Sequence, residues 1–178
     1  MAQVEAPATG QDPALVVAAQ AGDREAFGVL YERYGAMVHG VLLARVPIDA
    51  VDDLVQDVFL SAFQHLESLR QPEAFGGWLA AIARRRATDY HRHSRVTEDA
   101  TDLPAGDGAP QAEAREVLTA LNTLPIAYRE TLMLRLVEGM TGPEIAERTG
   151  LTPGSVRVNL HRGMKHLREK LGWKPEPI

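Results

Sequence analysis

The chain contains no cysteine among its 178 residues. This absence excludes disulfides, thiolate metal sites and cysteine nucleophiles in this chain, so any redox sensing must belong to a partner. No apolar run approaches the roughly 20 residues that a membrane span needs. Residues 1–13 also lack the basic flank and the apolar stretch of a secretory signal. We therefore expect a cytoplasmic protein without membrane insertion.

The formal net charge of -5 argues against a protein that coats nucleic acid indiscriminately, because such binding neutralises many phosphates. The charge is unevenly distributed along the chain. Residues 84–95 hold five arginines and one aspartate, or +4, and residues 152–174 hold six basic residues and one glutamate, or +5. Residues 96–116, between them, hold six acidic residues and one arginine, or -5. Two basic segments are thus separated by an acidic spacer.

Apolar residues recur at helical spacing in residues 14–95 and again from about residue 112 to residue 171. The intervening residues are mainly Pro, Gly, Ala, Asp and Thr, and they carry too little apolar surface to offset the entropy of ordering. The sequence therefore predicts an all-α fold, with two small helical domains joined by a flexible acidic linker. The predicted parts are a tail at 1–13, a first domain at 14–95, a linker at 96–111, a second domain at 112–172 and a tail at 173–178.

Several positions in the first domain predict where helices begin and which face is buried. Asp12 and Asp23 can each cap a helix, and Pro72 with the pair Gly76 and Gly77 marks a turn before a further helix. Between these points, residues 51–66 form an apolar stripe at three-and-four spacing, and the opposite face is acidic and polar.

The second domain contains the most informative local pattern. Thr141 and Glu144 form a capping box, and Gly150 supplies the turn conformation that a β-carbon would disfavour. Thr152 can cap the next helix, with Pro153 at its first position. Together these features predict a helix-turn-helix.

The second helix of this motif has a buried stripe and a basic outward face. Its amino-terminal residues suit base edges in a major groove, where Arg pairs with guanine and Asn with adenine, and later basic residues suit phosphates. The predicted DNA-binding residues are Ser155, Arg157, Val158, Asn159, His161, Arg162 and Lys165. One such helix binds weakly alone, so a second attachment is needed, either a dimer or a larger assembly.

Four segments, taken in order, resemble a bacterial RNA polymerase sigma factor of the extracytoplasmic-function (ECF) group of the sigma-70 family. They are DLVQDVFLSAF from Asp53, FGGWLAAIAR from Phe75, LPIAYRE from Leu124 and EIA from Glu144. The resemblance implies a subunit that binds core RNA polymerase, monomeric when free, and directs it to promoters. It also implies an anti-sigma factor as partner, and contacts with the coiled coil of the largest polymerase subunit and with the polymerase flap.

The resemblance assigns a role to each domain. In the first domain, the polymerase-binding positions are Asp52, Asp53, Gln56 and Asp57, and an acidic helix face does suit a basic partner helix. The minus-ten element of the promoter would be opened and held by stacking on an aromatic side chain while arginines follow the backbone. The positions for this are Arg70, Trp78, Arg84, Arg85, Arg86 and Arg92. The second domain would read the minus-thirty-five element.

The sequence departs from the family pattern at four positions. Arg85 replaces a common asparagine, Thr88 replaces an apolar residue, and Val158 and Asn159 stand where a small polar residue and an arginine are usual. An asparagine at 159 removes a cation that could hold a phosphate and offers an adenine-type pairing instead. The preferred promoter of this chain is therefore not expected to copy that of other members.

The sequence is compatible with two other interpretations. The chain could be a free-standing regulator that binds DNA as a homodimer through residues 125–171. It could also be an enzyme or metal protein using Asp52, Asp53 and Asp57, or the pair His91 and His93. We expect neither catalysis nor a cofactor nor a metal, because the two histidines point about 200° apart on a helix and no phosphate loop or nucleophile motif is present.

Overall fold

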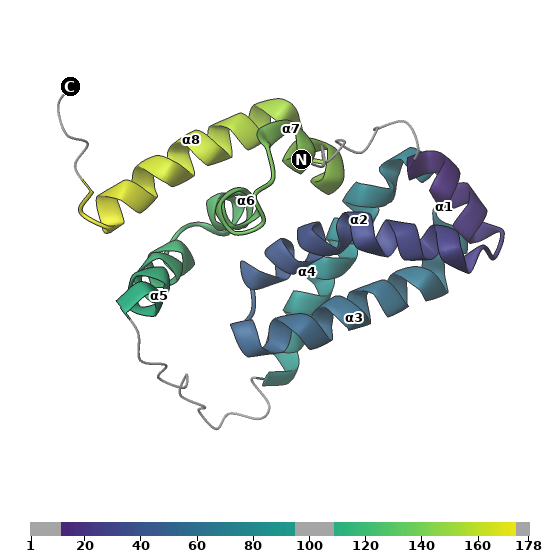
Figure 1. Ribbon diagram of the computed structural model, residues 1–178, viewed down its shortest axis with the longest axis horizontal. Helices are drawn as coiled ribbons and strands as arrows, with labels where there is room; N and C mark the ends of the chain where they lie inside the picture. Colours follow the sequence, from purple (N-terminus) through teal and green to yellow (C-terminus); the bar gives the residue numbers. More distant parts are fainter. Residues whose placement is uncertain (1–11, 95–108, 174–178) are drawn as a thin grey trace, which may run out of the picture.

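The computed structural model describes residues 12–94 and 109–173. Within those ranges all regular structure is helical, as the sequence predicts (Figure 1). Most of each predicted tail and most of the predicted linker lie outside the described residues, and α1 begins at Asp12, inside the predicted tail at 1–13. The α-helices are α1 (Asp12–Gln20), α2 (Arg24–Leu43), α3 (Ile48–His65), α4 (Phe75–Ser94), α5 (Ala109–Asn122), α6 (Ile126–Leu136), α7 (Gly142–Thr149) and α8 (Pro153–Lys170), and two short 3-10 turns, η1 (Leu66–Ser68) and η2 (Pro72–Ala74), precede α4.

The first module, α1 to α4, is a helical bundle around the central helix α2. Asp23 caps α2 as expected, because its carboxylate accepts from the backbone N–H groups of Glu25 and Ala26. Most of the predicted stripe of α3 is buried, with Val58 and Ala62 inaccessible to solvent, but Phe63 near its end is 47% exposed. The apolar spacing therefore locates the core of this module correctly.

Two details of the first module differ from expectation. The carboxylate of Asp12, expected to cap α1, instead accepts hydrogen bonds from Arg33 and Tyr34 of α2. Burial, and the adjacent Asp12, raise the pKa of the Tyr34 hydroxyl, so this hydroxyl stays a donor at neutral pH. Gly76 and Gly77, expected in a turn, lie inside the first turn of α4.

The second module, α5 to α8, is built around α6, which packs along α8. α5 begins at Ala109, so helix extends into the end of the predicted linker at 96–111. Gly163 of α8 lies against α6: a β-carbon there would be 3.0 Å from Leu132 Cδ1 and 3.1 Å from Tyr128 Cβ. This glycine sets the close spacing of α6 and α8, and the sequence pattern alone did not single it out.

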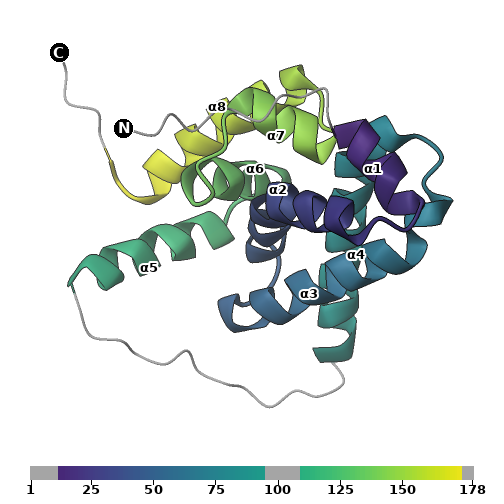
Figure 2. The ribbon, with the colours of Figure 1, turned by 45° about the vertical axis from the view of Figure 1, so that its right-hand side comes forward.

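The two modules pack directly against each other, whereas the sequence predicts modules tied only by a flexible linker. α6 and α7 lie beside α2 and α4 (Figures 1 and 2). Buried apolar residues of both modules form one continuous core. At Gly40 of α2 a β-carbon would come 2.7 Å from Leu134 Cδ2 of α6, so the absence of a side chain lets α6 approach.

Candidate nucleic-acid interface

The helix-turn-helix forms as its local residues predict. Thr141 and Glu144 make both hydrogen bonds of a capping box at the start of α7, and Gly150 ends that helix with a φ of 72°. The Thr152 hydroxyl then caps α8 by accepting from the N–H of Ser155 at 3.1 Å. These contacts fix the angle at which α8 leaves α7, and therefore which face of α8 reaches solvent.

The outward face of α8 carries the residues predicted to contact the minus-thirty-five element. Val156 and Leu167 are buried, and Val158 is 44% exposed. Six of the seven predicted residues are exposed on this helix: Ser155, Arg157, Val158, His161, Arg162 and Lys165. The structure therefore brings them together on one accessible surface, which we call the α8 face.

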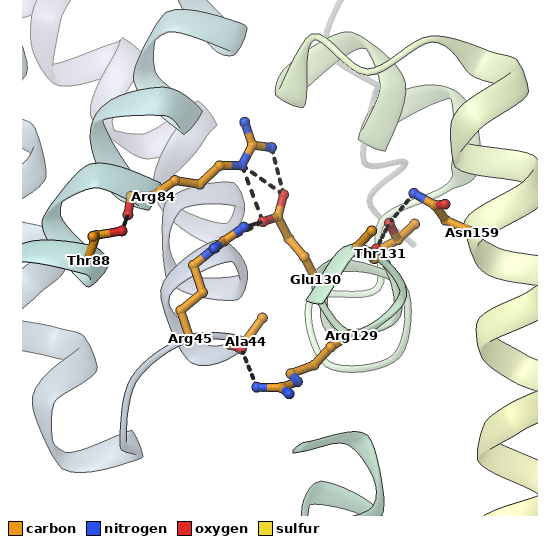
Figure 3. Close-up of polar contacts among 9 residues, drawn as sticks. Ala44, Arg45, Arg84, Thr88, Arg129, Glu130, Thr131 and Asn159 are labelled. Carbon is orange, nitrogen blue, oxygen red and sulfur yellow. Dashed lines mark hydrogen bonds and ion pairs between the residues drawn. The ribbon is translucent and has the colours of Figure 1, made fainter. Parts of the chain in front are cut away.

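Asn159 is the exception on this face. It is half-buried, and its Nδ2 lies 3.4 Å from Thr131 Oγ1 of α6, to which it donates (Figure 3). Thr131 in turn donates to the carbonyl of Ala127 at 2.8 Å. The amide of Asn159 is thus aimed toward α6, and a contact with a base edge requires this long hydrogen bond to break.

A hollow of about 550 Å³ lies where the first module meets the second, and two of the predicted minus-ten residues, Arg70 and Trp78, line it. Trp78 is half-buried and its ring lies 5.9 Å from that of Phe75, which is 1% exposed. Phe75 is therefore a core residue, and Trp78 is the aromatic side chain that faces the hollow. Glu147 and Gly150 of the second module line the same hollow.

The remaining predicted minus-ten residues lie along α4 and have different environments. Arg85 is exposed, Arg86 is half-buried, and Arg92 is exposed and pairs with Asp89 at 3.0 Å. Arg84 is held by Glu130 of α6, with Nη2 2.6 Å from Oε1. Only part of the arginine cluster is therefore available on the surface in this arrangement.

Glu130 is a buried charged residue that the sequence analysis did not identify. Its side chain is 5% exposed and accepts from both Arg84 and Arg45, each at 2.6 Å for the shortest contact (Figure 3). Burial raises the pKa of this carboxyl, but hydrogen bonds and charge from Arg84 and then Arg45 outweigh it, so the pKa lies below its usual value. The available signal was a glutamate two residues before the apolar run at 132–134.

The predicted polymerase-binding residues share the solvent-facing side of α3. Asp52, Asp53, Gln56 and Asp57 are all exposed. Further along the same helix, Leu60 is 56% exposed and Phe63 is 47% exposed. The structure thus places the four predicted residues on one acidic face that continues into exposed apolar side chains, and we call this the α3 face.

The residues considered for a metal site are engaged in other ways. His91 Nε2 lies 2.6 Å from the carbonyl oxygen of Arg45, and His93 Nδ1 lies 2.7 Å from that of Asp89. In residues 12–94 and 109–173, no three His, Asp or Glu side chains converge as a metal site would require. Within the same part of the chain, no helix is long and apolar enough to cross a membrane.

These features define a class of protein: an all-helical chain of two modules, in which the second carries a helix-turn-helix with an exposed basic face. Family models describe both modules. The sigma-70 region 2 family matches residues 30–97, and the sigma-70 region 4 family matches residues 114–167.

Individual relatives extend over most of the chain. It is 34% identical over 160 residues to the RNA polymerase sigma factor CarQ of Myxococcus xanthus, covering 85% of this chain and 92% of that protein. It is 30% identical over 179 residues to the ECF RNA polymerase sigma-E factor of Haemophilus influenzae, covering 90% and 95%. The solved structure of CnrH in complex with the cytosolic domain of CnrY matches with a TM-score of 0.65 at 28% identity, covering 92% of this chain and 99% of that one.

This chain therefore belongs to the ECF sigma factors of RNA polymerase. The family consists of transcription initiation factors, which are not enzymes.

Proposed function

We propose that this sigma factor directs core RNA polymerase to its promoters through three separate surfaces. The α8 face reads the minus-thirty-five element, the hollow and exposed arginines of the first module hold the minus-ten element, and the α3 face docks on the polymerase. The observation that carries the proposal is the exposed basic face of α8, which supports DNA binding by the helix that follows the turn.

The α8 face supports recognition of duplex DNA. Arg157 and Val158 lie in the first turns of the helix, where a recognition helix meets base edges, and both are exposed. Arg162 and Lys165 follow along the same helix and are exposed, so they can neutralise phosphates. Asn159 is proposed to add an adenine contact when its amide turns away from Thr131.

The hollow beside Trp78 supports capture of an unpaired base. Promoter opening exposes bases that can stack on an aromatic ring or enter a pocket, at a few kcal/mol per unstacked base. Arg70 lies at the same hollow, and Arg85 and Arg92 on α4 are accessible to the adjoining phosphates. Arg84 joins this set only when its ion pair with Glu130 is released, and Arg86 is half-buried.

The α3 face supports docking on the polymerase. Three carboxylates and exposed apolar side chains on one helix suit a partner helix that is basic along one edge, such as a coiled coil. The flap of the polymerase is the proposed contact of the second module.

A further protein partner is proposed for the state in which the sigma factor is restrained. The solved structure of CnrH is that of a complex with the cytosolic domain of CnrY. We infer that this chain is held by an anti-sigma factor in the same manner, in the cytoplasm, where the polymerase is present.

The polymerase contact can be tested by co-elution with core enzyme. Asp53→Lys combined with Asp57→Lys reverses the charge of the α3 face and should abolish co-elution. Glu32→Lys combined with Glu67→Lys makes the same change in net charge at exposed positions outside that face, and should leave co-elution intact. The proposal fails if the unaltered chain does not co-elute, or if it binds promoter duplex tightly as a homodimer without polymerase.

A further inference from the structure

One hydrogen bond joins the predicted recognition helix to the helix packed behind it. Asn159 of α8 donates through Nδ2 to Thr131 Oγ1 of α6 at 3.4 Å (Figure 3). Thr131 is 1% exposed, and Asn159 is half-buried. The amide of a residue predicted to read DNA is therefore engaged inside the protein.

The close packing of α6 and α8 brings these two side chains within reach of each other. Gly163 follows Asn159 by about one helical turn, and a β-carbon at Gly163 would lie 3.0 Å from Leu132 Cδ1. Leu132 directly follows Thr131, so α6 lies against α8 at this point. At this spacing a side chain as short as asparagine spans the gap between the helices.

The hydroxyl of Thr131 can only accept from Asn159. A threonine hydroxyl has one proton, and Thr131 donates it to the carbonyl oxygen of Ala127 at 2.8 Å. The hydroxyl oxygen therefore presents its lone pairs to α8, and the amide of Asn159 must turn its NH2 group, and not its oxygen, toward Thr131. Thr131 thus sets the orientation of the Asn159 amide.

Asn159 also borders the exposed side of α8. Ser155 lies four residues before it and Arg162 three residues after it, on the same side of the helix, and both are exposed. A change of side-chain rotamer can therefore carry the amide from Thr131 to DNA bound at the α8 face. Adenine presents N7 as an acceptor and its N6 amino group as a donor, so a bidentate contact uses both the nitrogen and the oxygen of the amide. Thr131 and adenine compete for the same NH2 group.

We propose that Thr131 is a positioning residue for base specificity: it holds the amide of Asn159 away from the DNA and so limits the preference for adenine at one position of the minus-thirty-five element. At 1% exposure Thr131 lies behind the recognition helix and cannot touch a base itself. The inference rests on the proposed function, in which Asn159 adds an adenine contact.

The hydrogen bond is tested first in the free full-length chain. The chain has two asparagines, Asn122 and Asn159, and Asn122 is exposed, so isotope-labelled asparagine gives only two side-chain amide signals by NMR. The Asn159 amide protons should exchange with solvent more slowly than those of Asn122. Thr131→Val removes the acceptor and should abolish this difference, whereas Thr131→Ser should keep it. Equal exchange of the two amides in the parent chain overturns the inference, whether or not the protein binds DNA.

The effect on recognition is tested with the sigma factor bound to core polymerase and a library of duplexes randomised across both promoter elements. Sequencing the bound fraction gives the base preference at every position. Asn159→Ala should abolish an adenine preference at one position, which identifies the base pair that Asn159 reads. At that position Thr131→Val should increase the preference for adenine about two- to five-fold, or about 0.4–1 kcal/mol, because the contact no longer breaks a hydrogen bond. Preferences at the other positions should match those of the parent chain.

Three controls separate positioning from a purely structural role. Thr131→Ser keeps the hydroxyl oxygen and should restore the parent preference. In the Asn159→Ala background, Thr131→Val should change no base preference, because its effect passes through the amide. Thr123→Val removes an exposed hydroxyl that donates to the carbonyl of Ala120 at 2.7 Å, and should have no effect.

The outcomes distinguish the inference from the proposed function. An unchanged adenine preference in folded Thr131→Val overturns the inference, as does a profile that Asn159→Ala leaves unaltered or a uniform loss of binding at all positions. Thr131→Ala removes the same acceptor and takes the place of Thr131→Val if that variant does not fold. If the parent complex with polymerase enriches no sequence at all, the proposed function fails, whereas solvent exchange still reports whether Thr131 holds Asn159.

Discussion

Replacing Glu130 by glutamine should destabilise the folded protein measurably. The carboxylate accepts charge-assisted hydrogen bonds from Arg45 and Arg84, with shortest contacts of 2.6 Å. Glutamine keeps one acceptor and turns an NH2 group toward guanidinium donors, so at least two such bonds are lost or weakened. Hydrogen bonds to charged groups contribute about 1.5–3 kcal/mol each.

The expected loss is smaller than that sum because both arginines can regain some hydration. Their side chains are 22% and 29% exposed in the contact, so the free energy of unfolding should fall by about 2–3 kcal/mol. For a chain of this size that corresponds to a decrease in Tm of roughly 4–12 °C. Circular dichroism at neutral pH measures it, with Glu67→Gln, an exposed glutamate, as the matched control.

The stabilising contribution of Glu130 depends on pH, and its lowered pKa gives the direction of that dependence. Because the pKa of Glu130 lies below the unfolded value of 4.5, its stabilising contribution is fully present above that value. It is lost as the pH falls through the lowered pKa of the folded state. The difference between the parent chain and Glu130→Gln should therefore be constant near neutral pH and shrink below about pH 4.5. A Tm change under about 2 °C at pH 7, or a difference that grows on acidification, would refute the reasoning.

Three further predictions concern the second module. Gly163→Val should lower the free energy of unfolding by about 1–3 kcal/mol, because a β-carbon at this position would lie 3.0 Å from Leu132 Cδ1 of α6. Chemical denaturation measures this change. An unchanged denaturation midpoint would contradict the close packing of α6 and α8. Thr152→Ala should cost about 1 kcal/mol in the same assay because α8 loses its cap, while Thr152→Ser should restore it. Arg162→Ala should weaken binding to all promoter sequences alike and reduce the slope of log affinity against log salt concentration by about one. An unchanged slope would contradict the proposed phosphate contact of Arg162. Arg157→Ala should instead reduce the preference for particular bases.

The helix-turn-helix could be predicted from the sequence because its determinants are local. Thr141 and Glu144 lie three residues apart, Gly150 adopts its positive φ within the turn, and Thr152 caps the helix that it precedes. None of these depends on a distant partner. The buried stripe of α3 could be predicted equally well, because helical periodicity separates a buried face from an exposed one.

The packing of the two modules could not be predicted in this way. Glu130 meets Arg45 and Arg84 across 85 and 46 residues, and no spacing rule connects them. Gly76 and Gly77 indicate a turn when only their neighbours are considered, since their role as a contact surface appears only when Arg148 and Gly150 lie against them. The sequence therefore predicts that Arg84 binds the minus-ten element but does not indicate that Arg84 is paired with Glu130.

Mapping transcription start sites with purified core polymerase tests the central claim most directly. With the sigma factor added, we predict initiation at a restricted set of promoters that share two spaced sequence elements, and the start sites should disappear when Asp53 and Asp57 are both changed to lysine. Initiation that is the same with and without the chain would contradict this account.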